Sequence, residues 1–580
     1  MEQNKTSEQS ELFRIDKTSN KNSLKVDGRI QNRTNQFLNN KDADELRINR
    51  SEHNEASRKV IKTQKFAKNR NYRKKDRSDT NIITGTPAEK IEHTITQAQS
   101  LWEEGMDIMD YFLILRDTKF ELIDFPLLQG LIKSDKDHNI LLAVVGLRKL
   151  LSLVDNSPDQ CVVDADLLPL LITLISRDDF PKIQFEALWC LTNIASGKAE
   201  HVKALVDKGT IPVFISLLGT THRNEDETET YHNSHRQNIV EQSIWALGNI
   251  AGEDTYYKAM IFKEGALKPL VNILKNAEPN SMMTRNCMWC ITNLLINKPF
   301  PTIEELVYII PIISKCLKSN EKEEIVIDGI RFITYISYAG KQTINKMIEL
   351  GIIEILNSYL KFADDISNEI ILLCVKTLGN FASAEEEQTQ AIIDAGVLPH
   401  FHDLLSHPDK TIVKEVCWAL SNICVGPNKH ISVLIELGTI KKLIELAKTG
   451  EHEVQKEAAW AICNLIYCKD IKIIEEIAKK GGIEAICYIL KNIVDTKIAV
   501  ILLEGIIKCL EAGKRGFINE NGENEFALIV DNCGGLSTIE SLQIHQNQYV
   551  YELCCKILDG YFIEDEDNSS VDFNIMIKQF

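Results

Sequence analysis

A short phrase of sequence returns at a nearly regular interval along most of this chain. It opens with a glycine and runs into an apolar stretch with helical spacing, as in Gly209-Thr-Ile-Pro-Val-Phe-Ile and Gly265-Ala-Leu-Lys-Pro-Leu-Val. The same glycine returns at Gly351, Gly396, Gly438, Gly482 and Gly535. Copies lie 42 to 56 residues apart, except for one gap of 86 that fits two periods with a degenerate copy near Val307–Leu317. Such a chain does not build one compact core, because each unit buries its apolar face against the next.

A period of about 40–47 residues with helix–turn–helix content is typical of armadillo and HEAT repeats. We expect each glycine to end a short helix where the backbone turns sharply. The predicted fold is all-α, an armadillo-repeat solenoid of about ten repeats over residues 121–562. Residues 1–80 are predicted to be a disordered basic arm, residues 81–120 a connector and residues 563–580 an acidic tail. The segment Thr220–Arg236 interrupts the period and is predicted to be a solvated loop.

Tryptophan follows the same period. Five of the six tryptophans are followed four residues later by asparagine, at Trp189/Asn193, Trp245/Asn249, Trp289/Asn293, Trp418/Asn422 and Trp460/Asn464. Two repeats between Trp289 and Trp418 lack tryptophan; there the frame continues with Arg331 and Tyr335, then Lys376 and Asn380. Residues four apart share one helix face. We therefore expect these pairs to project side by side from the last helix of each repeat and to line a concave surface.

A row of indoles with an amide beside each one suits an extended peptide rich in lysine and arginine. The aliphatic stems of such residues can lie between indoles, and the cationic heads gain a cation–π attraction of about 0.5–2 kcal/mol per site. Each asparagine amide can both donate to and accept from a peptide backbone. The alternative is that tryptophan only fills the core and asparagine only ends a helix. Five of six tryptophans in one frame favour the peptide groove, because a core position would accept leucine or phenylalanine as readily.

The net charge of −17 is unevenly distributed along the chain. Residues 1–78 hold 20 Lys/Arg against 11 Asp/Glu, whereas the remainder carries an excess of 26 acidic residues. A basic arm is thus joined to an acidic body. Such an arm could bind nucleic acid, an acidic partner or its own body.

Several classes of function have no support in the sequence. No dinucleotide-binding, phosphate-loop, zinc-protease or serine-hydrolase motif occurs, so we predict that the chain is not an enzyme and takes no cofactor. Cys287 and Cys290 have the spacing of a redox or zinc pair, but further ligands are missing nearby and we interpret them as buried thiols. We predict no metal site, and the scattered cysteines indicate a reducing compartment. The longest apolar run, Leu167–Ser176, is too short to span a bilayer.

Three local phrases are distinctive: Gln184-Phe-Glu-Ala-Leu-Trp-Cys-Leu-Thr-Asn-Ile-Ala-Ser-Gly197, Glu241-Gln-Ser-Ile-Trp-Ala-Leu-Gly-Asn-Ile-Ala-Gly252 and Cys533-Gly-Gly-Leu-Ser-Thr-Ile-Glu-Ser-Leu-Gln543. With these phrases the chain resembles the importin alpha family of nuclear-import adaptors. The similarity extends from about Arg33 to about Phe562. It implies a right-handed superhelical solenoid, cargo proteins with mono- or bipartite basic signals as ligands, importin beta and a recycling export receptor as partners, and shuttling between cytoplasm and nucleus.

The resemblance also implies two signal-binding sites. The major site would comprise Trp189, Asn193, Gly197, Gln242, Trp245, Asn249, Glu253, Trp289 and Asn293. The minor site would comprise Asn380, Thr389, Trp418, Asn422, Glu457, Trp460 and Asn464. Three positions depart from the family pattern: Arg331 stands where a tryptophan is usual, Glu253 where an aspartate is usual, and Val202 where a threonine is usual.

Residues 47–77 of the arm carry twelve basic side chains against three acidic ones. This stretch resembles the importin-beta-binding segment of the family, with its usual run of arginines reduced to Arg47-Ile-Asn-Arg50. The arm residues that we expect to bind importin beta, or to occupy the chain's own groove, are Arg47, Arg50, Arg58, Lys62, Lys65, Lys68, Arg70, Arg73, Lys74 and Lys75. A tether of a few tens of residues gives a local concentration near the millimolar scale, so the arm is predicted to compete with cargo until importin beta holds it.

Two other functions are compatible with an armadillo solenoid that carries a basic arm. An armadillo scaffold for acidic or phosphorylated partners would need lysines and arginines on its groove and has no use for an asparagine row. A nucleic-acid binder could act through the basic arm. The acidic body argues against both because it repels polyanions. We therefore predict no direct binding of nucleic acid, membrane or small-molecule substrate.

Overall fold

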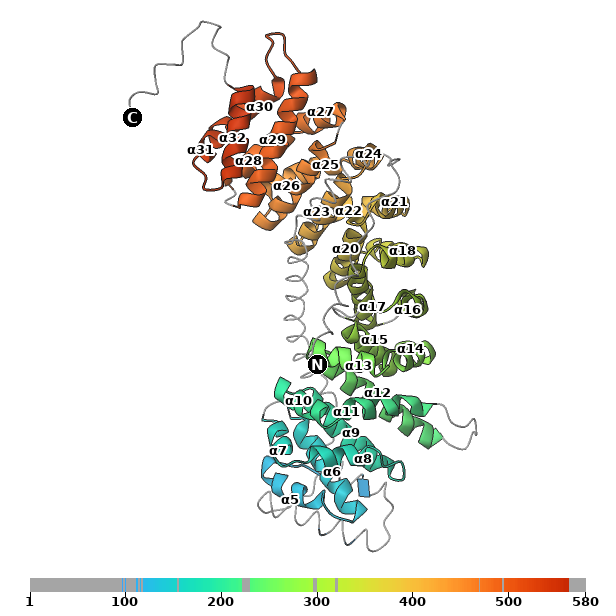
Figure 1. Cartoon of the computed structure of the whole chain (residues 1–580). Helices are drawn as coiled ribbons and strands as arrows, with labels where there is room; N and C mark the ends of the chain where they lie inside the picture. The colour runs from blue at the N-terminus through green and yellow to red at the C-terminus, as the bar shows by residue number, and fades with distance from the viewer. Residues whose placement is uncertain are drawn as a thin grey trace, which may run out of the picture. The chain divides into compact units, whose positions relative to one another are not determined.

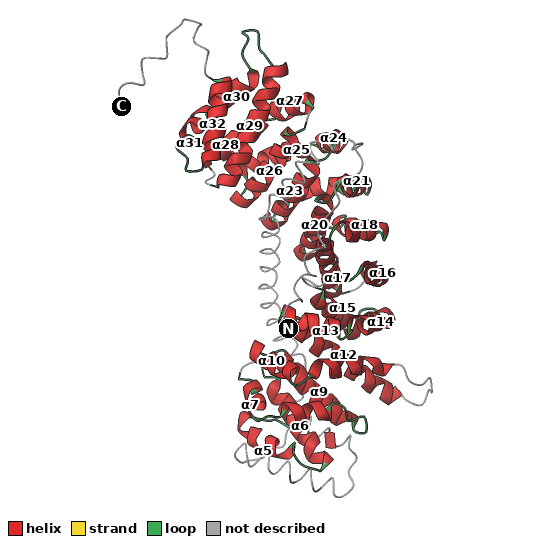
Figure 2. Cartoon of the chain, in the orientation of Figure 1, coloured by secondary structure: helices red, strands yellow, loops and turns green. Residues whose placement is uncertain are grey.

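The computed structural model describes residues 118–562, apart from 154–155, 222–229, 296–299, 319–321, 469 and 493–494, together with residues 96, 100, 111, 112 and 115. The predicted basic arm, most of the connector and the predicted acidic tail lie outside these residues. Figure 2 shows that the described part is built from helices and turns. It contains no β-strand, and an isolated bridge joins Ile518 and Asn524. The prediction of an all-α fold is confirmed.

Ten helices, which we call the long helices, form a continuous stacked series through the described residues (Figure 1). They are α6 (Asp137–Leu151), α9 (Pro181–Ala195), α12 (Thr230–Ala251), α15 (Met282–Leu294), α17 (Glu323–Ile336), α20 (Asn368–Ala382), α23 (Lys410–Cys424), α26 (His452–Ile466), α29 (Thr496–Gly516) and α32 (Gln548–Tyr561). Each of these helices packs against the next one in the series. The long helices therefore stack in chain order, as a solenoid requires.

Further helices, most of them shorter, precede each helix of this series and complete the repeat. They are η1 (Leu122–Asp124), α5 (Phe125–Leu131), α7 (Asp159–Asp164), α8 (Leu168–Leu174), α10 (Ala199–Asp207), α11 (Thr210–Leu217), η2 (Leu218–Thr221), α13 (Thr255–Lys263), α14 (Leu267–Asn276), α16 (Ile303–Lys318), η3 (Ser337–Ala339), α18 (Lys341–Glu349), α19 (Ile352–Leu360), α21 (Glu386–Asp394), α22 (Leu398–Leu404), α24 (Asn428–Glu436), α25 (Thr439–Thr449), α27 (Ile471–Lys479), α28 (Gly482–Asn492), α30 (Glu525–Asn532) and α31 (Gly535–Leu542). In Figure 1, α14, α16, α18 and α21 form a row beside the row of α15, α17 and α20.

The recurring glycine sits at the turn between the first and second helices of a repeat. Gly209, Gly351 and Gly438 have φ between 73° and 76° and directly precede α11, α19 and α25. This left-handed backbone is accessible to glycine without a steric cost, which explains why the turn recurs with it.

Two of the predicted turn glycines are wrong by one residue. The left-handed residues are Gly481 and Gly534, with φ of 87° and 75°, whereas Gly482 and Gly535 are the first residues of α28 and α31. The second residue of each pair must also be glycine, because a side chain there would meet the backbone of the preceding helix. A Cβ added to Gly482 would stand 2.9 Å from the Ile477 carbonyl oxygen.

The degenerate repeat uses one helix where the others use two. Val307–Leu317 lies inside α16, which continues through Pro311 and packs against α14, α17, α18 and α19. A single helix with acidic residues in its first turn and lysines in its last turn fits the helix dipole at both ends. This replacement explains why the glycine phrase is missing from that repeat.

The predicted solvated loop at Thr220–Arg236 is wrong for its second part. Residues 230–236 form the first two turns of α12, and the His235 ring is buried against Phe185, with ring centroids 6.2 Å apart. The stretch contains no glycine or proline to stop a helix. The buried ring gives this extension a packing contact with α9.

Candidate functional site

One side-chain position on the long helices recurs through the series and forms what we call the ladder. Its members, the rungs, are Arg148 on α6, Trp189 on α9, Trp245 on α12, Trp289 on α15, Arg331 on α17, Lys376 on α20, Trp418 on α23 and Trp460 on α26. All five indoles are partly exposed, and none is fully buried. A tryptophan that only filled the core would lose its contact with solvent, so the exposure leaves ring surface for another molecule.

The asparagine four residues after each tryptophan makes a hydrogen bond that sequence reasoning missed. Its Nδ2 donates to the preceding long helix: Asn249 to Thr192 O (3.3 Å), Asn293 to Gly248 O (3.1 Å), Asn422 to Gly379 O (3.2 Å) and Asn464 to Ser421 O (2.9 Å). Asn193 and Asn380 donate to the hydroxyls of Ser152 (3.0 Å) and Ser337 (2.8 Å). These amides therefore tie successive repeats together, and each is held in a fixed orientation beside its rung.

A second column of polar residues lies three residues before the rungs, one helical turn away. It consists of Glu186, Gln242, Asn286, Asp328, Glu415 and Glu457, whereas the positions before Arg148 and Lys376 hold the apolar residues Val145 and Leu373. Glu186, Asp328 and Glu415 are almost fully buried. Buried carboxylates require a cation or hydrogen-bond donors, so this column is a set of cation-holding positions beside the rungs. Gln242 and Glu457 were predicted as site residues, whereas Glu186, Asp328 and Glu415 were not.

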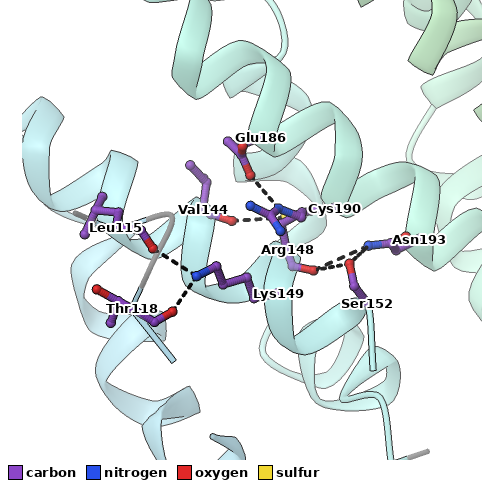
Figure 3. Close-up of polar contacts among 9 residues, drawn as sticks. All are labelled: Leu115, Thr118, Val144, Arg148, Lys149, Ser152, Glu186, Cys190 and Asn193. Atoms are coloured by element: carbon purple, nitrogen blue, oxygen red, sulfur yellow. Dashed lines mark hydrogen bonds and ion pairs between the residues drawn. The ribbon is translucent and has the colours of Figure 1, made fainter. Parts of the chain in front are cut away.

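Every cationic rung is paired with a carboxylate near this column. Arg148 Nε lies 2.7 Å from Glu186 Oε2, as Figure 3 shows. Arg331 Nη1 lies 2.7 Å from Asp328 Oδ1, and its other nitrogen pairs with Glu369. Lys376 Nζ lies 4.0 Å from Glu415 Oε1. In all three cases an acid of the next long helix takes part: Glu186 on α9, Glu369 on α20 and Glu415 on α23.

The first indole of the ladder already has a cation over it. The Arg148 guanidinium carbon lies 4.7 Å from the centre of the Trp189 ring, within the range of a cation–π contact. Phe185 packs on the same indole edge to face, with centroids 5.6 Å apart. The arrangement shows that an indole and a carboxylate on one helix can hold a guanidinium that comes from a neighbouring segment.

Glu241, next to Gln242 on α12, is a further acid of the ladder region. Burial raises the pKa of its carboxyl group above the usual value, and Asn286 Nδ2 donates to its Oε1 over 3.0 Å. This raised pKa reflects a carboxylate that has lost water without gaining a cation.

The remaining predicted residues occupy different environments. Gly197 precedes α10, and a Cβ there would stand 2.8 Å from His201 Nδ1. Glu253 follows α12 and is partly exposed, whereas the Asp254 carboxylate caps α13 by accepting a hydrogen bond from Tyr256 N over 2.6 Å. Thr389 is fully buried, and its hydroxyl lies 3.2 Å from the Ala382 carbonyl oxygen. Thr389 therefore does not present its side chain at the surface.

The two cysteines with the spacing of a metal or redox pair lie in the interior of the described body. Cys287 and Cys290 are fully buried on α15, and burial raises the pKa of both thiols. No group of three or more potential metal ligands occurs within the described ranges. No helix there is long and apolar enough to cross a bilayer.

Comparison with known proteins identifies the repeat. Residues 155–196, 254–296, 385–425 and 427–467 match the armadillo/beta-catenin-like repeat, and residues 524–576 match the atypical armadillo repeat. The chain is 31% identical to importin subunit alpha-1a of Oryza sativa subsp. japonica over 460 residues, which cover 78% of this chain and 82% of the relative. It is 32% identical to importin subunit alpha-2 of Arabidopsis thaliana over 451 residues, covering 77% and 81%. The chain belongs to the importin alpha family.

The armadillo matches of this importin alpha coincide with the ladder. Each of the four matched segments ends just after a Trp–Asn pair, those of Trp189, Trp289, Trp418 and Trp460. A crystal structure of an engineered protein aligns with a TM-score of 0.63 at 24% identity, covering 75% of this chain and 98% of that one, and supports the fold. The predicted armadillo fold and the resemblance to importin alpha are both confirmed.

Proposed function

We propose that this importin alpha is a nuclear-import adaptor that binds basic nuclear localisation signals along the ladder. The observation that supports this function best is the run of five partly exposed indoles, each with a fixed amide four residues further on. The peptide backbone would run along the partly exposed amides of Asn293, Asn422 and Asn464, and its lysine and arginine stems would lie between indoles. The adaptor would act by binding alone, without catalysis or a cofactor.

The chain's own cations indicate how a peptide cation would be held. Lys376 approaches Glu415 of the next long helix, and Arg148 approaches Glu186 of the next long helix. Glu457 stands in the same relation to Trp418, whose repeat has no cation of its own at the rung. A peptide lysine above Trp418 would therefore meet Glu457. It would take the place that Lys376 of the preceding repeat holds beside Glu415.

The two cationic rungs in the middle would divide the ladder into two binding sites. Arg331 and Lys376 are themselves cations and each lies near an acid, so both rungs would repel a peptide cation. Trp189, Trp245 and Trp289 would form the major site, and Trp418 with Trp460 the minor site. A bipartite signal with two basic clusters would engage both, whereas a single cluster would prefer one.

Charge selection at the centre of the major site is assigned to Glu253, which is partly exposed. Glu253→Lys should abolish binding of a single basic cluster, and Glu253→Asp should preserve it. Fluorescence anisotropy with a labelled basic peptide measures both. If Glu253→Lys binds as well as the parent protein, another group holds the central lysine.

The basic arm would link the adaptor to importin beta and compete with cargo when importin beta is absent. The arm's excess of positive charge and the acidic body favour their association, and the tether raises the local concentration. In this scheme the adaptor carries cargo from cytoplasm to nucleus, and an export receptor returns it.

Titration of a basic peptide into the intact chain and into a chain lacking residues 1–80 tests the arm. The shortened chain should bind more tightly, and addition of importin beta to the intact chain should have the same effect. Charge reversal at Arg73, Lys74 and Lys75 should reproduce the deletion if that cluster occupies the ladder; reversal at Lys68 and Arg70 should do so otherwise. Equal affinities throughout would show that the arm only docks importin beta.

A further inference from the structure

Arg148, the first rung of the ladder, covers the indole of the second rung, Trp189. Arg148 stands 41 residues before Trp189, at the rung position of α6, with Ser152 in the place of the asparagine. Its guanidinium does not extend into solvent but lies over the indole of the next rung, 4.7 Å from the ring centre. The chain therefore places its own arginine against the ladder where the series of indoles begins.

The contacts around Arg148 fix it in that position (Figure 3). Arg148 Nε donates to Glu186 Oε2 over 2.7 Å, and the two side chains keep only 14% and 2% of their exposure. Asn193 Nδ2 lies 3.5 Å from the Arg148 carbonyl oxygen and 3.0 Å from Ser152 Oγ. The neighbouring Lys149 points elsewhere, donating to the carbonyls of Leu115 and Thr118. One arginine alone thus serves both the indole and the carboxylate.

These two partners are the ones that a peptide arginine would need. An indole face supplies cation–π attraction, and a buried carboxylate supplies a charge-assisted hydrogen bond. While Arg148 is in place, it occupies both the indole face that it covers and the Glu186 carboxylate. A buried carboxylate left without its partner is strongly unfavourable, so Glu186 would accept a replacement cation once Arg148 is removed.

We propose that the space between α6 and α9 is a cation subsite of the ladder that the chain fills with its own Arg148. This proposal rests on the proposed function, and it makes Arg148 a specificity-determining residue. Arg148 occupies the subsite next to Trp189 and so limits how many successive basic residues of a signal the major site can bind.

The test compares three peptides on the full-length chain: a five-residue basic core, and the same core extended by one arginine at either end. The parent protein should bind all three with equal affinity. Arg148→Ala should bind one of the two extended peptides about tenfold more tightly than the core, the size expected for one desolvated cation–π contact. Adding Glu186→Gln to Arg148→Ala should remove most of this gain.

Arg177→Ala is a matched control. Arg177 also pairs with an acid, Asp179, and lies 5.9 Å from an aromatic ring, that of Phe180, but it is not on the ladder. Its removal should leave the preference among the three peptides unchanged. A gain for the extended peptides in Arg177→Ala equal to that in Arg148→Ala would contradict the proposal.

A second measurement needs no peptide. Ethylguanidinium at millimolar concentration should raise the melting temperature of Arg148→Ala and leave that of the parent protein unchanged, because the small cation enters the vacated subsite. If Arg148→Ala does not fold by itself, recovery of folded protein in ethylguanidinium replaces the peptide test. A folded Arg148→Ala chain that binds the three peptides equally overturns the proposal, and so does an unfolded one that ethylguanidinium does not recover. A parent protein that fails to bind the core peptide would instead count against the proposed function.

Discussion

The indole of Trp289 lies directly against Gly248 on the preceding long helix. A Cβ added to Gly248 would stand 2.3 Å from Cζ3 of that indole, and a Cβ added to Gly379 would stand 2.3 Å from Cζ3 of Trp418. At these two points, one in each predicted binding site, the ring packs over bare backbone. The glycines therefore determine where two of the five indoles lie.

Gly248→Ala should displace the Trp289 indole and weaken binding of a single basic cluster at the major site. Alanine is the better helix former, but overpacking against a rigid ring costs about 1–3 kcal/mol. Gly379→Ala should have the same effect on the minor site through Trp418. Isothermal titration with peptides that carry one or two basic clusters separates the two effects.

Gly130→Ala is the control for this pair. Gly130 lies in α5, and a Cβ there would meet no atom within 4 Å. This variant should bind both peptides like the parent protein. An unchanged affinity in Gly248→Ala and Gly379→Ala as well would show that the indole positions do not matter for binding.

Asn249→Ala should lower both affinity and stability. The side chain is fully buried, and its Nδ2 donates to Thr192 O, so its loss leaves a buried carbonyl without that donor. We expect a loss of about 1–3 kcal/mol of stability from the unpaired carbonyl. We also expect weaker peptide binding, because α12, which carries Trp245, loses this bond to α9. Calorimetry and peptide titration measure the two losses separately.

Asn276→Ala supplies the comparison, because Asn276 is exposed and bonds only within its own helix, to Asn272 O over 3.0 Å. It should leave peptide affinity unchanged. Should Asn249→Ala lose stability but keep its full affinity, the asparagine row would have only the structural role of joining repeats.

Arg331→Ala should destabilise the middle of the solenoid. Asp328 is almost fully buried, and Arg331 pairs with it and with Glu369. Breaking such a buried pair costs about 3–5 kcal/mol. Faster hydrogen exchange in α17 and α20 should report this loss. Lys203→Ala breaks an exposed pair with Asp207 and should cost less than about 1 kcal/mol; equal effects of the two substitutions would contradict the account.

Glu241→Gln should stabilise the protein at neutral pH. Burial raises the pKa of Glu241 in the folded state, so ionisation opposes folding at every pH above the folded-state pKa. As the pH falls through that pKa towards the unfolded value, the carboxyl group protonates and the penalty disappears. The increase in melting temperature should therefore be largest near pH 7 and vanish below about pH 4.5. A pH-independent gain in Glu241→Gln would contradict the assignment.

The repeat period predicted most of the fold because it records where each helix pair must turn. The features that the period did not predict depend on packing contacts between residues far apart in sequence. Two adjacent glycines at 481 and 482 look equivalent in sequence, but only the first is left-handed, while the second packs against Ile477. The polar residues 230–236 suggest a loop until the burial of His235 is known.

The same period put the tryptophans on the long helices, and it could have found more. Arg148 lies one period before Trp189, and Glu186, Asp328 and Glu415 lie one turn before their rungs. Which acids are already neutralised depends on side-chain geometry between repeats, and no spacing within one repeat reveals it. The buried hydroxyl of Thr389 is a similar case.

The most direct test of the central claim is a titration of one basic peptide into four chains: the intact protein, the protein lacking residues 1–80, and Trp245→Ala in each of them. Trp245 is the middle indole of the major site. The account predicts binding that is tighter without the arm, and a loss of about 1–3 kcal/mol in both chains that carry Trp245→Ala. Binding that is absent from both parent chains, or that Trp245→Ala leaves unchanged, would contradict the claim that the ladder holds basic signals.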